Sequence, residues 1–175
     1  TGCNVYQSYI KDTVPSLVST LGSLGYSKTA FHPYYGDGWN RRNVYPLLGF
    51  DNYISIEDFV DQDILDTYKQ NNDVMQYETL LRERYPDRNM LLRRFVSDSY
   101  DYSMVENMFE SRDTSKPFFL FNVTMQNHGG YAMSYTNFAQ EIYVTNMSTV
   151  YPKANRYLSL VKRSDDAFPE LTEYF

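Results

Sequence analysis

Residues 117–125, PFFLFNVTM, form a nearly continuous apolar run that follows a Lys-Pro turn. Runs of this kind are typical of the strands of parallel sheets, which are buried on both faces. The run leads straight into the polar stretch QNHGG, residues 126–130. We therefore predict a strand that is buried on both faces and that ends just before His128.

A second strand is predicted for residues 26–31, a short aromatic stretch between Gly25 and Pro33. This strand is expected to end at His32. Functional groups of open α/β sheets collect where strands end. The two histidines of the chain, His32 and His128, therefore both lie where chemistry is common.

Helical patterns of apolar residues accompany the predicted strands. One helix precedes the first strand, with Thr13 as its expected cap, and another runs from a cap at Asn40 to Gly49. A third helix is expected to be capped by Asp98 or Ser99. Each of these helices has enough apolar side chains to cover one face of a sheet.

The remaining segments complete the expected architecture. Residues 57–95 are rich in polar side chains, and we interpret them as helix and loop, an insertion on the outside of the sheet. Residues 152–175 show apolar side chains at helical spacing, with Pro169 expected to kink or interrupt the helix. Strands separated by helices predict an α/β layered sheet, and the length of the chain fits one domain.

Composition excludes several classes of function. A net charge of −6 leaves no basic face, so no nucleic-acid partner is expected. No stretch reaches the roughly 18 consecutive apolar residues that a membrane span needs. Cys3 is the single cysteine and cannot form a disulfide within the chain. Because the sequence opens on Thr1 and stops at Phe175 within a helical pattern, we expect it to be a piece of a longer protein.

The stretch FHPYYGDGWNRRN, residues 31–43, gathers directional side chains around a Gly-x-Gly turn at residues 36–38. We expect the glycines to allow a tight path, partly at positive φ, that brings Trp39 and Arg41 back beside His32. Arginine binds phosphate through two hydrogen bonds, tryptophan offers a flat apolar face, and histidine can donate to an anionic oxygen. This set of groups fits a phosphorylated polyol.

A structural interpretation of the same stretch stays open. In that alternative, Trp39 only anchors a surface loop and His32 merely ends a strand. The two arginines are then solvated or ion-paired, with Asp37 and Asp51 as partners. A Gly-x-Gly turn with mixed charge does not by itself decide between the two interpretations.

The second histidine lies in the stretch NHGG. Two glycines can let the backbone pass close to a ligand while Asn127 and His128 point at it. The alternative is a turn that simply leaves the sheet. The sequence has no short-range cluster of His, Cys, Asp and Glu, so no metal is expected to be bound by this chain.

Three stretches together resemble one family. They are FHPYYGDGWNRRNVYPLLGFDNY, VSDSYDYSMVENMFE and KPFFLFNVTMQNHGGY, and the similarity extends over the whole chain. The family is the lipoteichoic acid synthase and phosphoglycerol transferase group of Gram-positive bacteria, within the sulfatase and alkaline phosphatase superfamily. The resemblance implies a layered α/β/α sulfatase-like fold, of which residues 1–175 would be the central part.

What the family does sets the functional expectation. Its enzymes are anchored in the membrane and have an extracellular catalytic domain. There, a threonine nucleophile beside a divalent metal, often manganese, takes glycerol phosphate from phosphatidylglycerol and passes it to a growing polymer. The resemblance thus implies a phosphoglycerol transferase, with the phosphatidylglycerol headgroup, a glycerol phosphate polymer or a glycolipid acceptor, and the membrane as its partners.

The resemblance also assigns roles to residues. Groups that hold glycerol phosphate in the family match His32, Trp39, Arg41 and His128. The nucleophile and the metal ligands of the family fall before Thr1 and after Phe175, so Thr1 is not the nucleophile and no catalytic or metal-binding residue is expected within the chain. Because a metal lowers the pKa of the nucleophile and neutralises charge on phosphorus, the chain alone is expected to be inactive.

Two alternatives remain beside the transferase. The chain could be a stand-alone binding module for an anionic cell-wall polymer. It could also belong to a sulfate or phosphate ester hydrolase of the same fold, since the choice between water and an alcohol as acceptor depends on pocket walls outside the chain.

Overall fold

The computed structural model describes residues 5–145 and 151–175. Thr1, Cys3 and the other residues outside these ranges are not considered further. The chain forms two compact units, which are described separately. The first comprises the described residues up to Gln62 together with Met108–Val123, and the second comprises Asp63–Asn107 and the described part of Thr124–Phe175. No described helix combines the length and the apolar character needed to cross a membrane.

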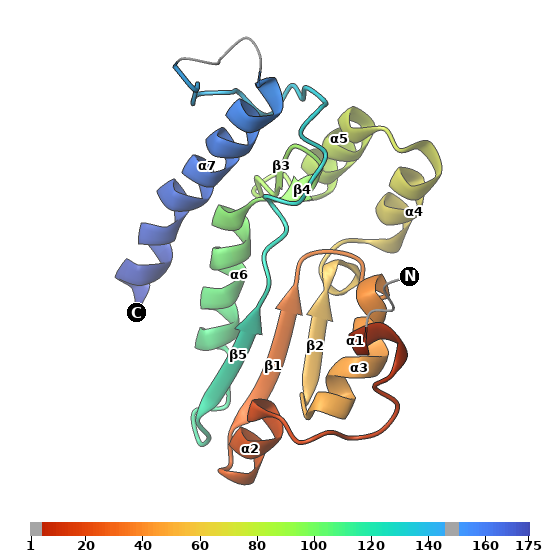
Figure 1. Ribbon diagram of the computed structural model, residues 1–175, viewed down its shortest axis with the longest axis vertical. Helices are drawn as coiled ribbons and strands as arrows, with labels where there is room; N and C mark the ends of the chain where they lie inside the picture. The colour runs from red at the N-terminus through yellow and green to blue at the C-terminus, as the bar shows by residue number, and fades with distance from the viewer. Residues whose placement is uncertain (1–4, 146–150) are drawn as a thin grey trace. The chain divides into compact units, whose positions relative to one another are not determined.

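The first unit is a small parallel sheet with short helices (Figure 1). Its elements are α1 (Val5–Ser8), α2 (Leu17–Ser23), β1 (Ser27–His32), η1 (Gly38–Asn40), α3 (Arg41–Leu48), β2 (Asn52–Ser55), η2 (Ile56–Asp58) and β5 (Phe118–Asn122). The strands lie in the order β2-β1-β5, and β1 is parallel to both neighbours. The parallel α/β sheet predicted from the sequence is confirmed.

The central strand is β1, and not the strand that the sequence singled out. Five of its six residues are buried, and Ala30 and Phe31 are almost fully inaccessible. In contrast, β5 is half-buried, and Phe121 is 42% exposed. The prediction that this strand is buried on both faces is wrong for the described chain, since no residue of β5 is fully buried. In this sheet β5 is also an edge strand, with β1 as its neighbour.

The helix before β1 begins later than predicted. The cap of α2 is Ser16, whose side chain accepts a hydrogen bond from the Ser19 N–H, while the Ser19 side chain accepts from the Ser16 N–H. This reciprocal capping box satisfies two backbone donors that a cap at Thr13 would leave open. The helix that ends at Gly49, with φ 100°, is confirmed. Asn40 lies at its N-cap position but makes no side-chain hydrogen bond to the start of the helix.

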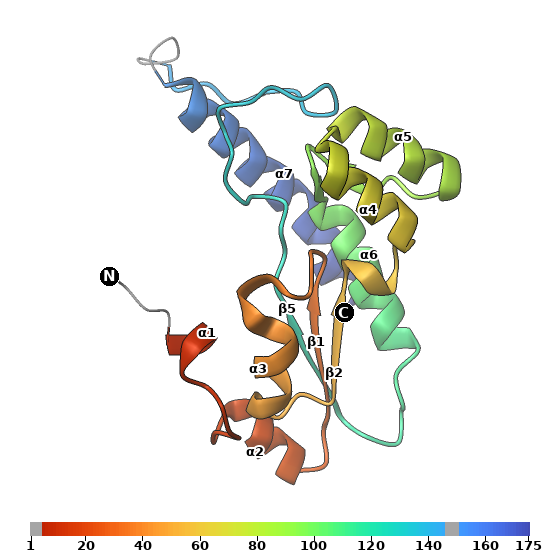
Figure 2. The same ribbon diagram turned by 90° about the vertical axis from the view of Figure 1, so that its right-hand side faces the viewer.

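Helix α3 lies against one face of this sheet, which Figure 2 shows nearly edge-on, and aromatic rings join the two. The Tyr45 ring of α3 contacts the rings of Tyr53 and Phe121 edge-to-face, at centroid distances of 4.8 and 6.4 Å. The Phe50 ring stacks near Phe119 at 6.3 Å. Such pairs add to the free energy gained from apolar burial. Much of the aromatic content of the sequence therefore serves this packing.

The second unit is mainly helical. Its elements are α4 (Gln62–Asn71), α5 (Val74–Arg84), β3 (Leu91–Leu92), β4 (Phe95–Val96), α6 (Asp98–Glu110), whose last residues belong to the first unit, and α7 (Pro152–Tyr174). The two short strands form an antiparallel pair. Helix and loop alone were predicted here, and two-residue strands are too short to produce an alternating pattern.

The predicted helix is present as α6, but its cap is Ser97 and not Asp98 or Ser99. The Oγ of Ser97 accepts a hydrogen bond from the Tyr100 N–H at 3.3 Å, and the Ser97 carbonyl accepts from Asp101. Asp98 is instead the first helical residue and is buried.

Helix α7 departs from its prediction in two ways. It continues through Pro169 without interruption. The missing hydrogen bond leaves the carbonyl of Asp165 unbonded within the helix, and Asp165 is exposed, so water can satisfy it. Of the predicted apolar stripe, Leu160 is buried, together with Asn155, Ser159 and Ala167. Other side chains of that stripe are exposed, among them Tyr157 at 44% and Phe168 at 51%.

Candidate functional site

His32 is the last residue of β1, as predicted, and only 2% of its surface is exposed. Its Nδ1 lies 2.6 Å from the carbonyl oxygen of Val123, which follows β5. Because a carbonyl can only accept, Nδ1 must carry a proton in this contact. The two adjacent parallel strands therefore fix the ring orientation of His32, and any contact with a ligand must use Nε2.

The Gly-x-Gly turn after β1 works differently from the prediction. Neither Gly36 nor Gly38 has a positive φ; the left-handed residues are Trp39 and Asn40, at 58° and 60°. The glycines instead make room for guanidinium groups. A Cβ on Gly36 would lie 2.6 Å from Cζ of Arg42, and a Cβ on Gly38 would lie 3.2 Å from Nη1 of Arg41.

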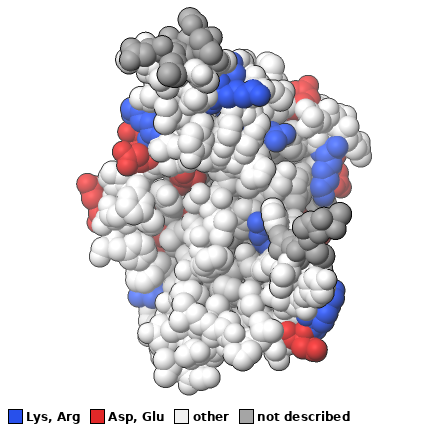
Figure 3. All heavy atoms as spheres, in the orientation of Figure 1, with Lys and Arg blue, Asp and Glu red and all other residues white. Residues whose placement is uncertain are grey.

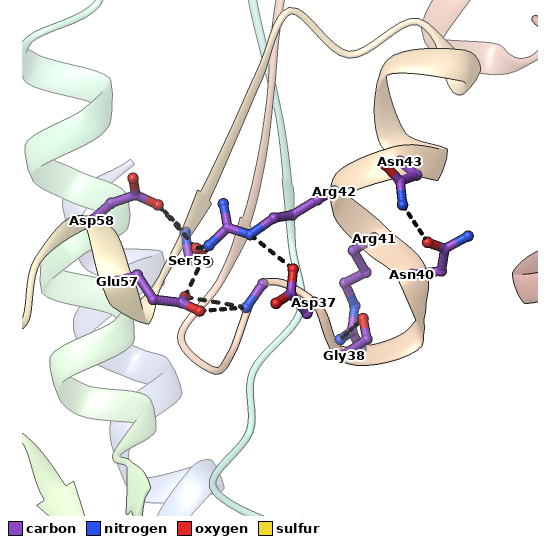
Figure 4. Close-up of polar contacts among 10 residues, drawn as sticks. Asp37, Gly38, Asn40, Arg41, Arg42, Asn43, Ser55, Glu57 and Asp58 are labelled. Atoms are coloured by element: carbon purple, nitrogen blue, oxygen red, sulfur yellow. Dashed lines mark hydrogen bonds and ion pairs between the residues drawn. The ribbon is translucent and has the colours of Figure 1, made fainter. Parts of the chain in front are cut away.

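Arg42 is held within a cluster of polar groups (Figure 4). It makes ion pairs at 3.3 Å with Asp37 and with Glu57, and its Nη2 donates to the Ser55 hydroxyl. The Glu57 carboxylate also accepts hydrogen bonds from the Gly36 N–H, at 3.1 and 3.2 Å. Arg42 thus serves the loop, as the structural interpretation of the sequence expected, with Glu57 in place of Asp51.

The ionisation of Glu57 reflects this cluster. Burial alone would raise the pKa of its carboxyl, but hydrogen bonds from the backbone, Ser55 and Gly36, with the charge of Arg42, outweigh burial and lower it. Glu57 is therefore a stable anion at neutral pH. Asp51 ion-pairs with the buried Lys28 instead, at 2.9 Å.

Arg41 turns away from its neighbour, as Figure 4 shows at the start of α3. Its Nη1 donates to the Gly38 carbonyl at 3.0 Å, and no carboxylate of the described residues makes an ion pair with it. Arg41 and Trp39 border one cavity of about 580 Å³ in the first unit. The other residues around the cavity are Tyr6, Ser16, Leu17, Val18, Tyr45, Leu48, Phe50, Phe119, Phe121 and Val123. Arg41 is thus a cation at the border of a largely apolar hollow.

The second histidine lies in the second unit, in the loop after β5. His128 is exposed, and its ring meets the Phe95 ring edge-to-face at 5.6 Å. Gly130 has a positive φ of 99°, as a close turn requires. The Asn127 side chain donates to the Ser164 hydroxyl of α7 at 2.7 Å. Asn127 therefore contacts α7, and its contact with a ligand stays a prediction.

The loop that carries His128 is tied to the rest of the second unit by buried polar groups. The Gln126 side chain accepts from the Asp98 N–H at 2.9 Å and donates to the Asp98 carboxylate and the Ser164 hydroxyl. Burial raises the pKa of the Asp98 carboxyl, although hydrogen bonds from Ser164 and Thr124 oppose this change. The network fixes the position of Gln126 between α6 and α7.

The resemblance places the manganese ligands of the family outside this sequence, and the described residues provide no alternative set. No group of three or more His, Cys, Asp and Glu side chains in residues 5–145 and 151–175 is arranged to hold a metal ion.

Of the four predicted site residues, the structure brings two to one cavity. Trp39 and Arg41 border it, and His32 is bonded to the carbonyl of Val123, another cavity residue. His128 belongs to the other unit, so a common site for all four residues stays a prediction. Sequence reasoning missed Tyr6, because no pattern links α1 to the loop after β1.

Charged side chains do not gather by sign on the face in Figure 3. Blue Lys and Arg side chains are spread over this face, and several stand near red Asp and Glu. Ion pairs of the described residues include Arg163 with Glu141 and Arg84 with Asp63. The absence of a nucleic-acid partner remains an expectation from composition.

Comparisons with known proteins agree with this fold. A curated protein of Rhizobium meliloti (strain 1021), provisionally named a cyclic beta-1,2-glucan modification protein, is 29% identical over 178 residues, which cover 97% of this chain and 22% of the relative. The crystal structure of lipoteichoic acid synthase LtaP from Listeria monocytogenes is similar at a TM-score of 0.66 and 18% identity, covering 98% of this chain and 35% of LtaP. A Vibrio parahaemolyticus protein of the alkaline phosphatase superfamily reaches 0.54 at 16% identity, covering 96% of this chain and 34% of that one.

The chain thus spans about a fifth of the curated relative and about a third of each solved structure. The structural similarities confirm the predicted fold class, a sulfatase-like α/β fold. A family model described as Sulfatase matches residues 1–175, the full length of the sequence. The chain therefore belongs to the sulfatase family.

Proposed function

We propose that this chain is the substrate-binding part of an extracellular, membrane-anchored phosphoglycerol transferase, which moves glycerol phosphate from phosphatidylglycerol to a polymer or glycolipid acceptor. Membership of the sulfatase family and the fold shared with a lipoteichoic acid synthase support the proposal. One observation carries it further: Arg42 is neutralised by carboxylates, whereas Arg41 beside Trp39 has no such partner among the described residues.

Each proposed site residue has a chemical role. Arg41 retains guanidinium donors beyond the one bonded to Gly38 and binds the phosphate of the substrate. Trp39, which is 53% exposed, packs its apolar face against the glycerol. His32 donates from Nε2 when its ring is protonated, since Nδ1 is bonded to Val123. His128 is the second imidazole of the site.

The catalytic groups of such an enzyme are proposed to lie in other segments of the same protein. The threonine nucleophile and the manganese ligands that the resemblance implies would be supplied there. Bound manganese would stabilise negative charge on the transferring phosphoryl group. This chain would hold and orient the glycerol phosphate, and it would have no turnover alone.

A glycan acceptor is the second candidate for the receiving substrate. The name of the Rhizobium meliloti relative, which is 29% identical, refers to modification of cyclic beta-1,2-glucan. A transferase with the same donor site could place glycerol phosphate on a sugar hydroxyl instead of on glycerol. The donor chemistry and the four binding residues would be the same in both cases.

Calorimetric titration of the chain with glycerol phosphate tests the binding role. We expect Arg41→Gln to weaken binding at least about tenfold, because a charge-assisted hydrogen bond to phosphate contributes about 1.5–3 kcal/mol. Arg82→Gln is the matched control, since Arg82 is a surface residue of the second unit that pairs with Glu78. Equal affinities of the wild type and Arg41→Gln would contradict the proposal.

The full-length protein tests the reaction. With manganese and phosphatidylglycerol, we expect release of diacylglycerol together with transfer of glycerol phosphate to an added acceptor. Free glycerol phosphate with no modified acceptor would instead indicate a hydrolase. No diacylglycerol from a folded, metal-loaded protein would exclude the transferase, and a stand-alone binding module would retain affinity in the titration alone.

A further inference from the structure

Arg93 is a buried arginine in the turn between β3 and β4. Only 2% of its surface is exposed, which makes it one of the largest fully buried side chains of the described residues. Its Nη2 donates two hydrogen bonds, to the carbonyl oxygen of Gln126 at 2.7 Å and to that of His128 at 2.8 Å. One guanidinium nitrogen therefore holds two carbonyls of the loop that carries His128.

The guanidinium of Arg93 is surrounded by aromatic rings and carbonyl groups rather than by carboxylates. No carboxylate of the described residues pairs with it, and its Nε has no hydrogen-bond partner. The rings of Phe95, Tyr131 and Tyr135 surround the guanidinium at 5.4 to 6.0 Å. A buried charge without an ionic partner is costly, so the carbonyl bonds and ring contacts must offset that cost.

The backbone of Arg93 is also constrained. Its φ is 58°, in the left-handed region, and its carbonyl accepts a hydrogen bond from the Asn137 side chain at 2.8 Å. Left-handed conformations of residues other than glycine persist only where the surroundings enforce them, and they cluster at functional sites. The strained turn aims the guanidinium at the loop.

Phe95 extends this support to the imidazole itself. Its ring contacts the His128 ring at 5.6 Å and the Arg93 guanidinium at 5.4 Å. Arg93 thus contacts both the peptide carbonyl of His128 and the Phe95 ring that packs against the imidazole. These contacts add to the hydrogen bond from the His128 N–H to the Met125 carbonyl, at 3.0 Å, and they act on the exposed His128 from the side of Arg93.

We propose that Arg93 is the positioning residue of His128: by binding the carbonyls of Gln126 and His128, it holds the imidazole in the orientation that contacts the substrate. The substrate contact rests on the proposed function, but the control of orientation does not. Arg93 itself is too deeply buried to touch a ligand.

Nuclear magnetic resonance of the imidazoles tests the positioning directly, because the chain has two histidines. His128→Gln assigns the two signals. The test variant is Arg93→Asn, since asparagine tolerates the left-handed conformation while removing the guanidinium. The control is Arg88→Asn, at an exposed arginine of the same unit. We expect Arg93→Asn to shift and broaden the His128 signal and to leave the His32 signal unchanged.

Ligand binding then separates positioning from general stability. We expect Arg93→Asn and His128→Gln each to weaken glycerol phosphate binding on the order of tenfold, and the double variant to be no weaker than either, since residues acting through one another are not additive. Arg93→Lys, which retains charge and donors, should restore part of the affinity and the His128 signal.

Each result has a defined meaning. An unchanged His128 signal in folded Arg93→Asn overturns the inference, and so do additive losses in the double variant. If the wild type fails to bind glycerol phosphate, the proposed function is contradicted for this chain, while the His128 signal still decides whether Arg93 positions the loop.

Discussion

The guanidinium of Arg42 lies where a side chain on Gly36 would begin: a Cβ at Gly36 would be 2.6 Å from Cζ of Arg42. The same guanidinium pairs with Asp37 and Glu57. A side chain at position 36 would therefore have to displace the end of the Arg42 side chain from these ion pairs. The neighbouring arginine, Arg41, borders the cavity instead.

Replacing Gly36 tests this closure. We expect Gly36→Ala to lower the free energy of unfolding by about 1–3 kcal/mol, because the added methyl group must displace a guanidinium that is held by two ion pairs. Gly129→Ala is the control, since a Cβ there meets no atom within 4 Å and its φ is not positive. Chemical denaturation measures both. Equal effects of the two substitutions would show that Arg42 moves aside at no cost.

The ion pair between Lys28 and Asp51 predicts a dependence of stability on pH. Lys28 is buried, and both its N–H and its Nζ donate to the Asp51 carboxylate at 2.9 Å. Burial alone would raise the pKa of Asp51, but these bonds and the charge of Lys28 lower it below the ordinary 3.8. A carboxyl with a lowered pKa stabilises the fold above its unfolded value, and this contribution is lost as pH falls through the folded value.

We therefore expect Asp51→Asn to destabilise the protein at pH 7 by about 1–3 kcal/mol, since a buried ammonium loses its partner. The difference from the wild type should shrink below about pH 4, where the wild-type carboxyl also becomes neutral. Thermal denaturation between pH 3 and 7 provides the measurement. Asp12→Asn, at an exposed aspartate of the same unit, should show no such change; a constant difference at every pH would contradict the assignment.

The sequence predicted the local elements of the first unit well, because each has its own signal. β1 is bounded by Gly25 and Pro33, and α3 ends at Gly49. The burial of β5 could not be predicted in the same way, since it depends on which segments pack against the faces of the strand and not on its own apolar run.

In the candidate site, too, features with a local sequence signal were predicted and features that depend on distant contacts were not. The pattern of residues 31–43 drew attention to Trp39 and Arg41, and both border the cavity; their role in binding stays a prediction. The positive φ values were assigned to the wrong residues, since glycine permits such a conformation but a close contact can require glycine for another reason. Arg93 carries no local pattern at all, because its partners are more than thirty residues away.

The start of α2 offers a direct comparison between a predicted and an observed cap. Ser16 forms the capping box with Ser19, and its hydroxyl also donates to the Leu48 carbonyl at 2.6 Å. We expect Ser16→Ala to cost about 1 kcal/mol of stability, as is usual for loss of a cap. Thr13→Ala should have little effect, because Thr13 is exposed and lies outside the helix. A larger loss from Thr13→Ala, in denaturant titrations, would contradict the structure.

The sequence predicted that Pro169 would kink or interrupt the last helix, but α7 is continuous there. Replacing this proline should therefore stabilise the protein. The helix continues through Pro169, which lacks the N–H that would donate to the Asp165 carbonyl. Because Pro169 is exposed, little packing is lost when its ring is removed. We expect Pro169→Ala to raise the free energy of unfolding by about 1–3 kcal/mol, which is at most the cost of proline inside a helix.

Pro152 provides a control within the same helix. It lies in the first turn of α7, where proline fits the helical backbone and no hydrogen bond is missing. Pro152→Ala should therefore give no gain, and amide hydrogen exchange should slow in the second half of α7 only in Pro169→Ala. If both variants are equally stable, or if Pro169→Ala is the less stable, the ring of Pro169 makes contacts that outweigh the missing hydrogen bond.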